Sequence, residues 1–251
     1  MLKPITTETA QRICCLVIGP AGIGKTSLIR TILGQGNDDG NGWKTLEGFT
    51  PEKVCVLSAE SGLLCVRDLV SAGQVEGFEI GSITDFHEAL RMCRTEEFKA
   101  RGYQWLFIDS LTEIASRCAE NLQEKYPSKT DSFKMWAEYS STMTDIIKAF
   151  RDMDSCNVCF TCLQAYDKDE FNRRFPAPDI AGSSLKQRLT SYFDEVFVMD
   201  RVASSLDPND PKPVLVFQTY EPVGLAKDRS GRLAPKERPN LLHIKRKILG
   251  S

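Results

Sequence analysis

GPAGIGKT occupies residues 19–26, and this stretch decides the fold that the sequence predicts. It fits the pattern G-x-x-x-x-G-K-[ST], a loop whose backbone N–H groups hold phosphate. An apolar run rich in β-branched residues, 13–18, precedes the loop, and a helical pattern over residues 27–33 follows it until Gly34. The motif therefore lies between a buried strand and a helix, which is the setting that phosphate binding requires.

The residue types in this loop suit the binding of ATP and Mg²⁺. Glycines let the backbone turn so that successive N–H groups converge on one phosphate. We expect a helix to start near Lys25, Lys25 to reach the β- and γ-phosphates, and the Thr26 hydroxyl to bind Mg²⁺. The nucleotide-binding residues predicted from the motif are Gly19, Pro20, Ala21, Gly22, Ile23, Gly24, Lys25, Thr26 and Ser27. The alternative is a glycine-rich turn that binds nothing.

The composition limits the classes of protein that remain. The chain has 251 residues, 41% hydrophobic content and a net charge of −2, which fits one domain over residues 1–251 with a basic segment at 226–251. Near-neutral charge argues against a surface coated for nucleic-acid binding, but it is compatible with a local basic patch. Nine cysteines, no signal-peptide pattern and no membrane-spanning apolar run predict a cytoplasmic protein without a membrane partner.

Three cysteines, Cys156, Cys159 and Cys162, show the C-x2-C-x2-C spacing found in part of an iron–sulfur motif. The surrounding residues, 157–163, have the pattern of a central strand. Cysteines three apart on a strand point to opposite faces, so they cannot converge on one cluster. We therefore expect buried free thiols here rather than metal ligands.

Apolar runs alternate with helical patterns along the rest of the chain. The expected strands are residues 53–58, 78–80, 105–109, 157–164, 195–199 and 214–219. The expected helices are residues 84–94, with Ser82 or Thr84 as cap, then 110 to about 126, and 131–153. Residues 165–186 have the composition of a long functional loop. Strands alternating with helices predict an α/β fold with a mostly parallel sheet and helices on both faces.

Ligands of such sheets bind at the carboxyl ends of the strands, where three polar residues are expected. Asp109 ends an apolar strand and is predicted to hold Mg²⁺; otherwise it caps the next helix. Ser110 follows it, where many ATPases have a catalytic glutamate, so Glu60 is the better candidate for the base that activates water. Gln164 could sense the γ-phosphate. The alternatives are a solvated loop acid for Glu60 and a polar strand end for Gln164.

At these positions the chain resembles RecA-like ATPases. The matching stretches are GPAGIGKT at 19–26, SAESG at 58–62, FIDS at 107–110 and FTCLQ at 160–164. More narrowly, it resembles the small phage-encoded P-loop proteins of the Sak type, which are minimal recombinases or single-strand annealing proteins. The stretches 136–139, 149–153 and 226–231 fit that group, and the resemblance covers about residues 12–235. It implies a RecA-like core in which Glu60 activates water and Gln164 ends the next core strand.

The resemblance also implies partners. Lys227 and Arg229 resemble the paired basic residues of the Lys-Asn-Arg-Phe-Gly motif in RadA, which reach a neighbour's ATP site. Self-association as a ring or filament would follow, with the ATP site at the subunit interface; the alternative for this pair is a charged turn. The implied substrate is single-stranded DNA in phage recombination or annealing, in the host cytoplasm, with a single-strand binding protein as a further candidate partner.

Two basic stretches are candidates for the DNA contact. Arg173 and Arg174 lie in residues 165–186, the segment that binds DNA in RecA-like proteins, although this segment also carries acids. Residues 241–244 are expected to form a short edge strand, from whose end Lys245, Arg246 and Lys247 would project toward phosphate. The alternative for these three is a solvated basic terminus.

Other functions remain open at this stage. An ATPase switch or loader that binds a protein rather than DNA would carry the same motifs. A nucleotide kinase would need an arginine-rich lid, and the acids beside Arg173 and Arg174 oppose a phosphate site there. A GTPase is disfavoured because the purine-reading Asn-Lys-x-Asp stretch is absent.

Overall fold

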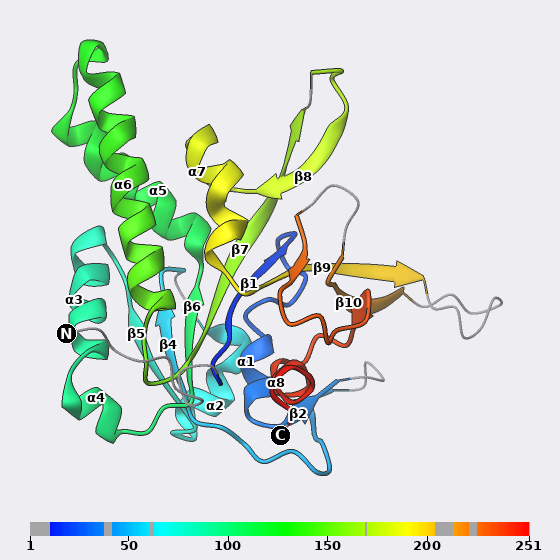
Figure 1. Cartoon of the computed structure of the whole chain (residues 1–251). Helices are drawn as coiled ribbons and strands as arrows, with labels where there is room; N and C mark the ends of the chain where they lie inside the picture. The colour runs from blue at the N-terminus through cyan, green and yellow to red at the C-terminus, as the bar shows by residue number, and fades with distance from the viewer. Residues whose placement is uncertain are drawn as a thin grey trace.

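The expected parallel sheet forms the centre of the molecule (Figure 1). The computed structural model describes residues 11–37, 42–60, 63–168, 170–203, 213–220 and 225–250. The main sheet has the order β12-β10-β9-β1-β7-β6-β4-β5, and its strands from β9 to β5 run parallel. Their bounds are Glu195–Ala203 (β9), Cys14–Gly19 (β1), Asn157–Lys168 (β7), Trp105–Asp109 (β6), Val54–Ser58 (β4) and Val75–Glu79 (β5).

Shorter strands extend this sheet with antiparallel pairing. Two of them, β10 (Pro213–Gln218) and β11 (Lys227–Asp228), pair with β9, and β12 (Lys236–Glu237) pairs with β10. The strand β8 (Arg174–Pro178) pairs with the far half of β7. A separate two-stranded sheet joins β2 (Gln35–Gly36) to β3 (Lys44–Thr45).

Helices cover both faces of the sheet, as the sequence predicts. One apolar core packs against α3 (Ile83–Cys93), α5 (Leu111–Lys125), α6 (Ser132–Arg151) and α7 (Ser183–Arg188). The other packs against α1 (Leu28–Ile32), α2 (Arg67–Ser71) and α8 (Leu241–Leu249). Side chains of β1 alternate between the two cores, which explains why this strand is a continuous apolar run: both of its faces are buried. A further helix, α4 (Glu96–Ala100), follows α3.

Two local predictions about caps and cysteines are confirmed. Ser82 is the N-cap of α3, and its hydroxyl accepts a hydrogen bond from the Asp85 N–H at 3.1 Å. Cys156, Cys159 and Cys162 are buried free thiols. Cys159 faces one core while the other two face the opposite core, and burial raises the pKa of Cys156 and Cys162 to about 11.

The expected loop at residues 165–186 is wrong over most of its length, because the end of β7, all of β8 and the start of α7 lie within it. The strand β7 continues to Lys168, and β8 returns beside it, with Gln164 opposite Pro178 and Lys168 opposite Arg174. Pro176 and Pro178 argued against a strand here in the sequence. Proline is nevertheless tolerated on an edge strand, because no neighbouring strand on that side accepts a hydrogen bond from its backbone nitrogen. The result is a β-hairpin that projects beyond the carboxyl end of the sheet (Figure 1).

The expected edge strand at residues 241–244 is also wrong, because this segment is the start of helix α8. The Asn240 side chain caps the helix by accepting the His243 N–H at 2.9 Å, and Gly250 ends it with a left-handed φ of 73°. Leu241, Ile244 and Ile248 share one helix face and pack into the core around α1. A short, mostly apolar run of four residues fits a strand and a helix equally well. The capping residues Asn240 and Gly250 are the local features that indicate a helix.

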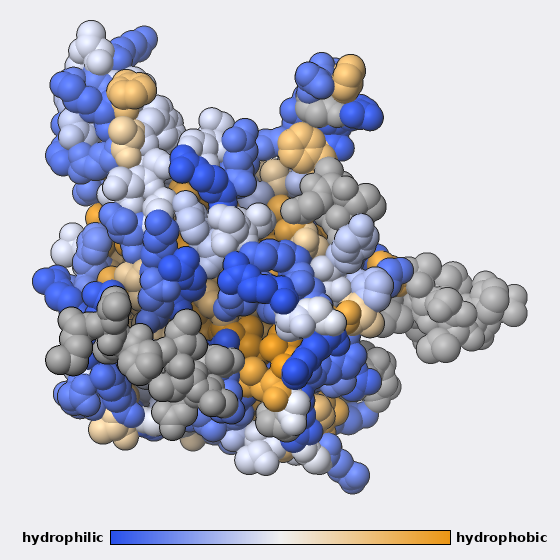
Figure 2. Space-filling model, in the orientation of Figure 1, coloured by the Kyte–Doolittle hydropathy of each residue, from blue (hydrophilic) through white to orange (hydrophobic). Residues whose placement is uncertain are grey.

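The helices α5 and α6 project beyond the sheet in the same general direction as the β7–β8 hairpin (Figure 1). Apolar side chains are visible on both projections, above a mostly hydrophilic face (Figure 2). Phe133 on α6 is 86% exposed and Phe171 in the hairpin is 70% exposed. Among the described residues, no helix has the length and apolar content needed to cross a bilayer.

Candidate nucleotide site

The GPAGIGKT loop joins β1 to α1 at the carboxyl end of the sheet. Gly22 and Gly24 have φ values of 72° and 107°, in the left-handed region that glycine adopts without strain. Gly19 has no room for a side chain, because a Cβ there would lie 3.0 Å from the Met199 carbonyl oxygen. The helix begins at Leu28 rather than near Lys25. The helix α1 has only five residues.

The Lys25 side chain folds over this loop. Its Nζ donates hydrogen bonds to the carbonyl oxygens of Gly19 and Pro20, both at 2.9 Å. Burial lowers the pKa of Lys25, while the negative charges of Asp109 and Glu60 act in the opposite direction. The ammonium group is therefore held beside the loop amides, where it can exchange its carbonyl partners for phosphate oxygens.

Asp109 ends β6 with both carboxylate oxygens engaged. Oδ2 accepts a hydrogen bond from the Thr26 hydroxyl at 2.6 Å, and Oδ1 accepts one from the Thr161 hydroxyl of β7. Burial raises the pKa of Asp109, and the bonds from Thr161 and Thr26 oppose that shift. A hydroxyl beside a carboxylate is the oxygen-rich setting that Mg²⁺ prefers, so Thr26 and Asp109 fit the expected metal. No cluster of three acidic, histidine or cysteine ligands occurs among the described residues, so phosphate oxygens would complete the shell.

Thr161 was not identified as a site residue from the sequence. It is a fully buried hydroxyl in the apolar part of β7, residues 158–163, and the β6–β7 register pairs Ile108 with Phe160, which sets Thr161 beside Asp109. A lone hydroxyl in an apolar strand next to the Asp109 strand was the available signal.

Glu60 follows β4 at the same end of the sheet. The Ala59 N–H donates to the Asp109 carbonyl oxygen at 2.6 Å, and the Ser58 hydroxyl donates to the Glu60 carbonyl oxygen at 2.7 Å. The Glu60 side chain is exposed, and its charge raises the pKa of both Lys25 and Asp109. The fold therefore brings Lys25, Asp109 and Glu60 into one electrostatic environment.

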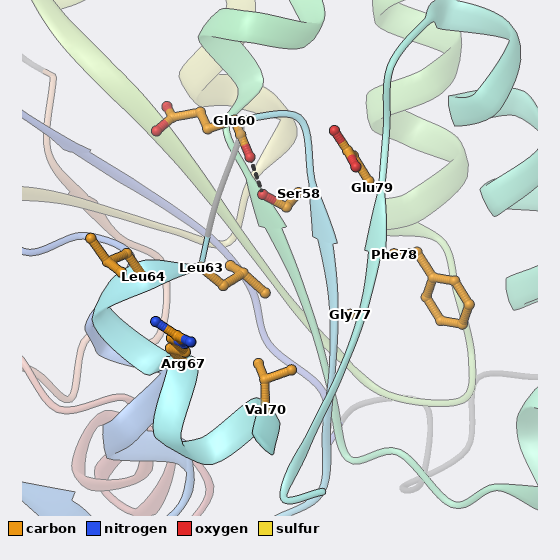
Figure 3. A pocket seen from close by; sticks show the side chains of 9 residues that line it. All are labelled: Ser58, Glu60, Leu63, Leu64, Arg67, Val70, Gly77, Phe78 and Glu79. Carbon is orange, nitrogen blue, oxygen red and sulfur yellow. Dashed lines mark hydrogen bonds between the residues drawn. The ribbon is translucent and has the colours of Figure 1, made fainter. Parts of the chain in front are cut away.

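A pocket of about 540 Å³ lies beside Glu60. Leu63, Val70 and Gly77 contribute to its apolar wall, and the Glu60 carboxylate points away from that wall (Figure 3). This direction leaves the carboxylate accessible to water.

Gln164 lies near this set, whereas Lys227 and Arg229 do not. Gly19 pairs with Leu163, so Gln164 is next to the start of the loop; its amide donates to the Tyr166 hydroxyl at 3.1 Å. Lys227 pairs with Val196, which lies opposite Leu16 near the amino end of β9, whereas the loop follows the carboxyl end of β1. The roles predicted for these three residues stay predictions.

Both basic residues of this pair have partners within the chain. Lys227 Nζ donates to the Phe193 carbonyl oxygen at 2.6 Å, and Arg229 forms an ion pair with Asp194 at 2.7 Å. Burial lowers the pKa of Lys227, and the charge of Arg229 adds to that shift. These contacts fix both side chains near the amino end of β9.

The residues predicted to bind DNA fall in two different environments. Arg173 and Arg174 are exposed on the β7–β8 hairpin. In α8, Lys245 pairs with Glu52 at 2.5 Å and Lys247 pairs with Glu237 at 2.7 Å. Arg246 donates to the Gly48 carbonyl oxygen and lies 4.2 Å from the centre of the Phe49 ring. Contact with DNA stays a prediction for both groups.

The sequence matches the family model described as an AAA domain over residues 11–230. The match includes the loop, Glu60, Asp109, Thr161 and Gln164. No curated protein matches the chain.

Proposed function

Because the chain belongs to the AAA-domain family of P-loop ATPases, we propose that it hydrolyses ATP while acting on single-stranded DNA, as a RecA-like protein of the phage Sak type in recombination or annealing. One observation carries the ATPase part of this proposal. Four groups needed for phosphoryl transfer to water come together at the carboxyl end of the sheet: the loop amides, Lys25, the Thr26–Asp109 pair and Glu60.

The residues divide the work of hydrolysis between them. The loop amides and Lys25 bind the β- and γ-phosphates, and Thr26 and Asp109 hold Mg²⁺, which neutralises phosphate charge when bound. Glu60 orients a water molecule and accepts its proton. Gln164 senses the γ-phosphate. Lys227 and Arg229 act on the site of a neighbouring subunit, where a cation stabilises charge on the transferring group.

The β7–β8 hairpin is the better supported DNA contact. Arg173 and Arg174 are exposed there, and the same hairpin exposes two aromatic rings, Tyr166 and Phe171. Cations beside exposed rings suit a single strand, whose backbone carries charge and whose unpaired bases can stack. Lys245, Arg246 and Lys247 form a second candidate contact, which would have to give up the partners that the fold supplies.

An ATPase switch that binds a protein partner is the second candidate. Phe133 is 86% exposed on the α5–α6 projection, and Trp136 is 38% exposed one turn further along α6. Exposed aromatic residues of this kind are common at protein interfaces.

Two measurements on the full chain test the proposal. In the first, Lys25→Ala should lower ATP turnover by about 10²-fold or more, because a positioned donor to the transferring group is lost. Lys134→Ala, which changes a 72% exposed lysine on α6, is the matched control and should turn over at the parent rate. Parent turnover in Lys25→Ala would remove the basis of the ATPase assignment.

The second measurement titrates the protein into a fluorescently labelled DNA single strand of arbitrary sequence at several salt concentrations. Binding to DNA phosphates predicts an affinity that falls linearly on a log–log plot against salt. Absence of binding at low salt, together with normal ATP turnover, would favour the protein-binding switch.

A further inference from the structure

We propose that Arg117 is a positioning residue for Glu60, acting through the backbone of Ala59. This inference rests on the proposed role of Glu60 as the base. Arg117 lies on α5, the helix that follows Asp109 directly, and so it links the metal-binding strand to the segment that carries the base.

The contacts of the Arg117 guanidinium define this link. Nη2 donates to the Ala59 carbonyl oxygen at 3.0 Å, and Nη1 donates to the Gly81 carbonyl oxygen. Nη2 also lies 3.3 Å from a carboxylate oxygen of Glu113, one turn earlier on α5. One side chain therefore holds the ends of two neighbouring strands, β4 and β5, against the helix.

Ala59 is held on both sides as a result. Its N–H donates to the Asp109 carbonyl oxygen at 2.6 Å, and its carbonyl oxygen accepts from Arg117. Glu60 is exposed and its side chain forms no hydrogen bond among the described residues, so the contacts that position it are those of its own backbone and of Ala59. Removing the Arg117 anchor leaves the Ala59 carbonyl free to rotate.

The shape of the side chain matters for this role. The guanidinium is a planar fork that reaches both carbonyl oxygens at once, whereas the single ammonium of lysine cannot. Its Nε is buried without a hydrogen-bond partner among the described residues. An unpaired buried N–H costs free energy. The fold bears this cost while the two Nη atoms keep their bonds to the carbonyl oxygens, and an arginine exposed on the surface would have no such cost.

The test compares turnover at saturating MgATP for the parent, Arg117→Ala, Arg117→Lys and the control Glu113→Gln. The control removes the ion pair with Glu113 but keeps the bond to Ala59. Misplacement of a catalytic group by about 1 Å can cost about 100-fold, so Arg117→Ala should lower kcat by about 10- to 100-fold with unchanged affinity for ATP. Arg117→Lys should be nearly as slow, and Glu113→Gln should match the parent.

A double variant separates positioning from a general structural role. If Arg117 acts through Glu60, then Glu60→Gln/Arg117→Ala should be no slower than Glu60→Gln alone. Multiplied losses in the double variant, parent kcat in both Arg117 variants, or failure of both to fold would each overturn the proposal. Parent kcat in Glu60→Gln would instead overturn the proposed role of Glu60 itself, so the two failures are distinguishable.

Discussion

The β7–β8 hairpin and the C-terminal segment, residues 225–250, both carry arginines that are candidates for DNA contact, but the fold uses their charges differently. In the hairpin, Arg173 and Arg174 are exposed on a projection from the sheet. In the C-terminal segment, carboxylates of the same chain hold the cations: Arg229 pairs with Asp194, Lys245 with Glu52 and Lys247 with Glu237.

This difference shows that a count of charges does not separate a binding surface from a structural one. Two of these three partners lie far away in the sequence: Glu52 precedes β4 and Asp194 precedes β9. Neither of these two carboxylates can be identified as a partner from the sequence of the basic segment alone. The described contacts tie this segment to the body of the protein, whereas Arg173 lies on the projecting hairpin with its guanidinium 5.1 Å from the centre of the exposed Phe171 ring.

The largest expected effect concerns buried Glu195, which faces the half-buried Asp228 of the C-terminal segment. Glu195 is 2% exposed, and burial together with the charge of Asp228 raises its pKa from 4.5 to about 8. The folded state therefore binds this proton more tightly than the unfolded state does. Its contribution to stability is fully present below pH 4.5 and is lost as the pH rises toward and through about 8.

Glu195→Gln should remove this dependence, because the amide mimics the protonated acid. The stability of the variant relative to the parent should rise by about 3 kcal/mol between pH 5 and pH 8. Urea unfolding at several pH values measures this difference, and a constant difference across that range would show that the pKa of Glu195 is the same in the folded and unfolded states.

The next effect tests whether Lys247 is structural. Its partner Glu237 has a side chain that is only 4% exposed, so Lys247→Ala leaves a buried carboxylate without its ammonium group. We expect a loss of about 2 kcal/mol in the free energy of unfolding. Lys236→Ala, at an exposed position in β12, is the matched control. Equal free energies of unfolding for the two variants would show that Lys247 does not stabilise the fold.

The smallest effect compares the two basic stretches directly. Arg173→Ala/Arg174→Ala should weaken single-stranded DNA binding by about tenfold and reduce the salt slope by about 1.4, which is about 0.7 for each lost phosphate contact. Neutralising Lys245, Arg246 and Lys247 should reduce it by less than the roughly 2.1 expected from three contacts, because Lys245 and Lys247 are already paired. A larger loss of salt slope in the α8 variant than in the hairpin variant would indicate that DNA binds at α8 instead.

Elements with a strong local signal were predicted well from the sequence. The strand–loop–helix unit at residues 13–33, the buried strand ending in Asp109 and the Ser82 cap all depend on neighbouring residues, and the fold confirms each of them. The same is true of the cysteines, whose separation onto two faces follows from the strand period alone.

Features that depend on distant residues were missed or wrong. Thr161 and Arg117 reach the site through contacts 52 and 58 residues away along the chain. The lone hydroxyl of Thr161 among apolar neighbours is a weak local signal, and no local pattern marks Arg117. The short run at residues 241–244 was assigned to a strand because its apolar residues alone do not distinguish the two periods. Its packing against α1, where the Leu241 N–H donates to the Thr31 hydroxyl at 3.1 Å, decides for a helix.

Single-turnover ATP hydrolysis by Glu60→Gln tests the central claim most directly. The amide has nearly the shape of the carboxylate but cannot accept the proton of water. The account predicts parent affinity for MgATP and a hydrolysis rate lower by about two orders of magnitude or more, the usual contribution of a positioned base. Hydrolysis by Glu60→Gln at the parent rate would contradict it, because another group would then orient the water.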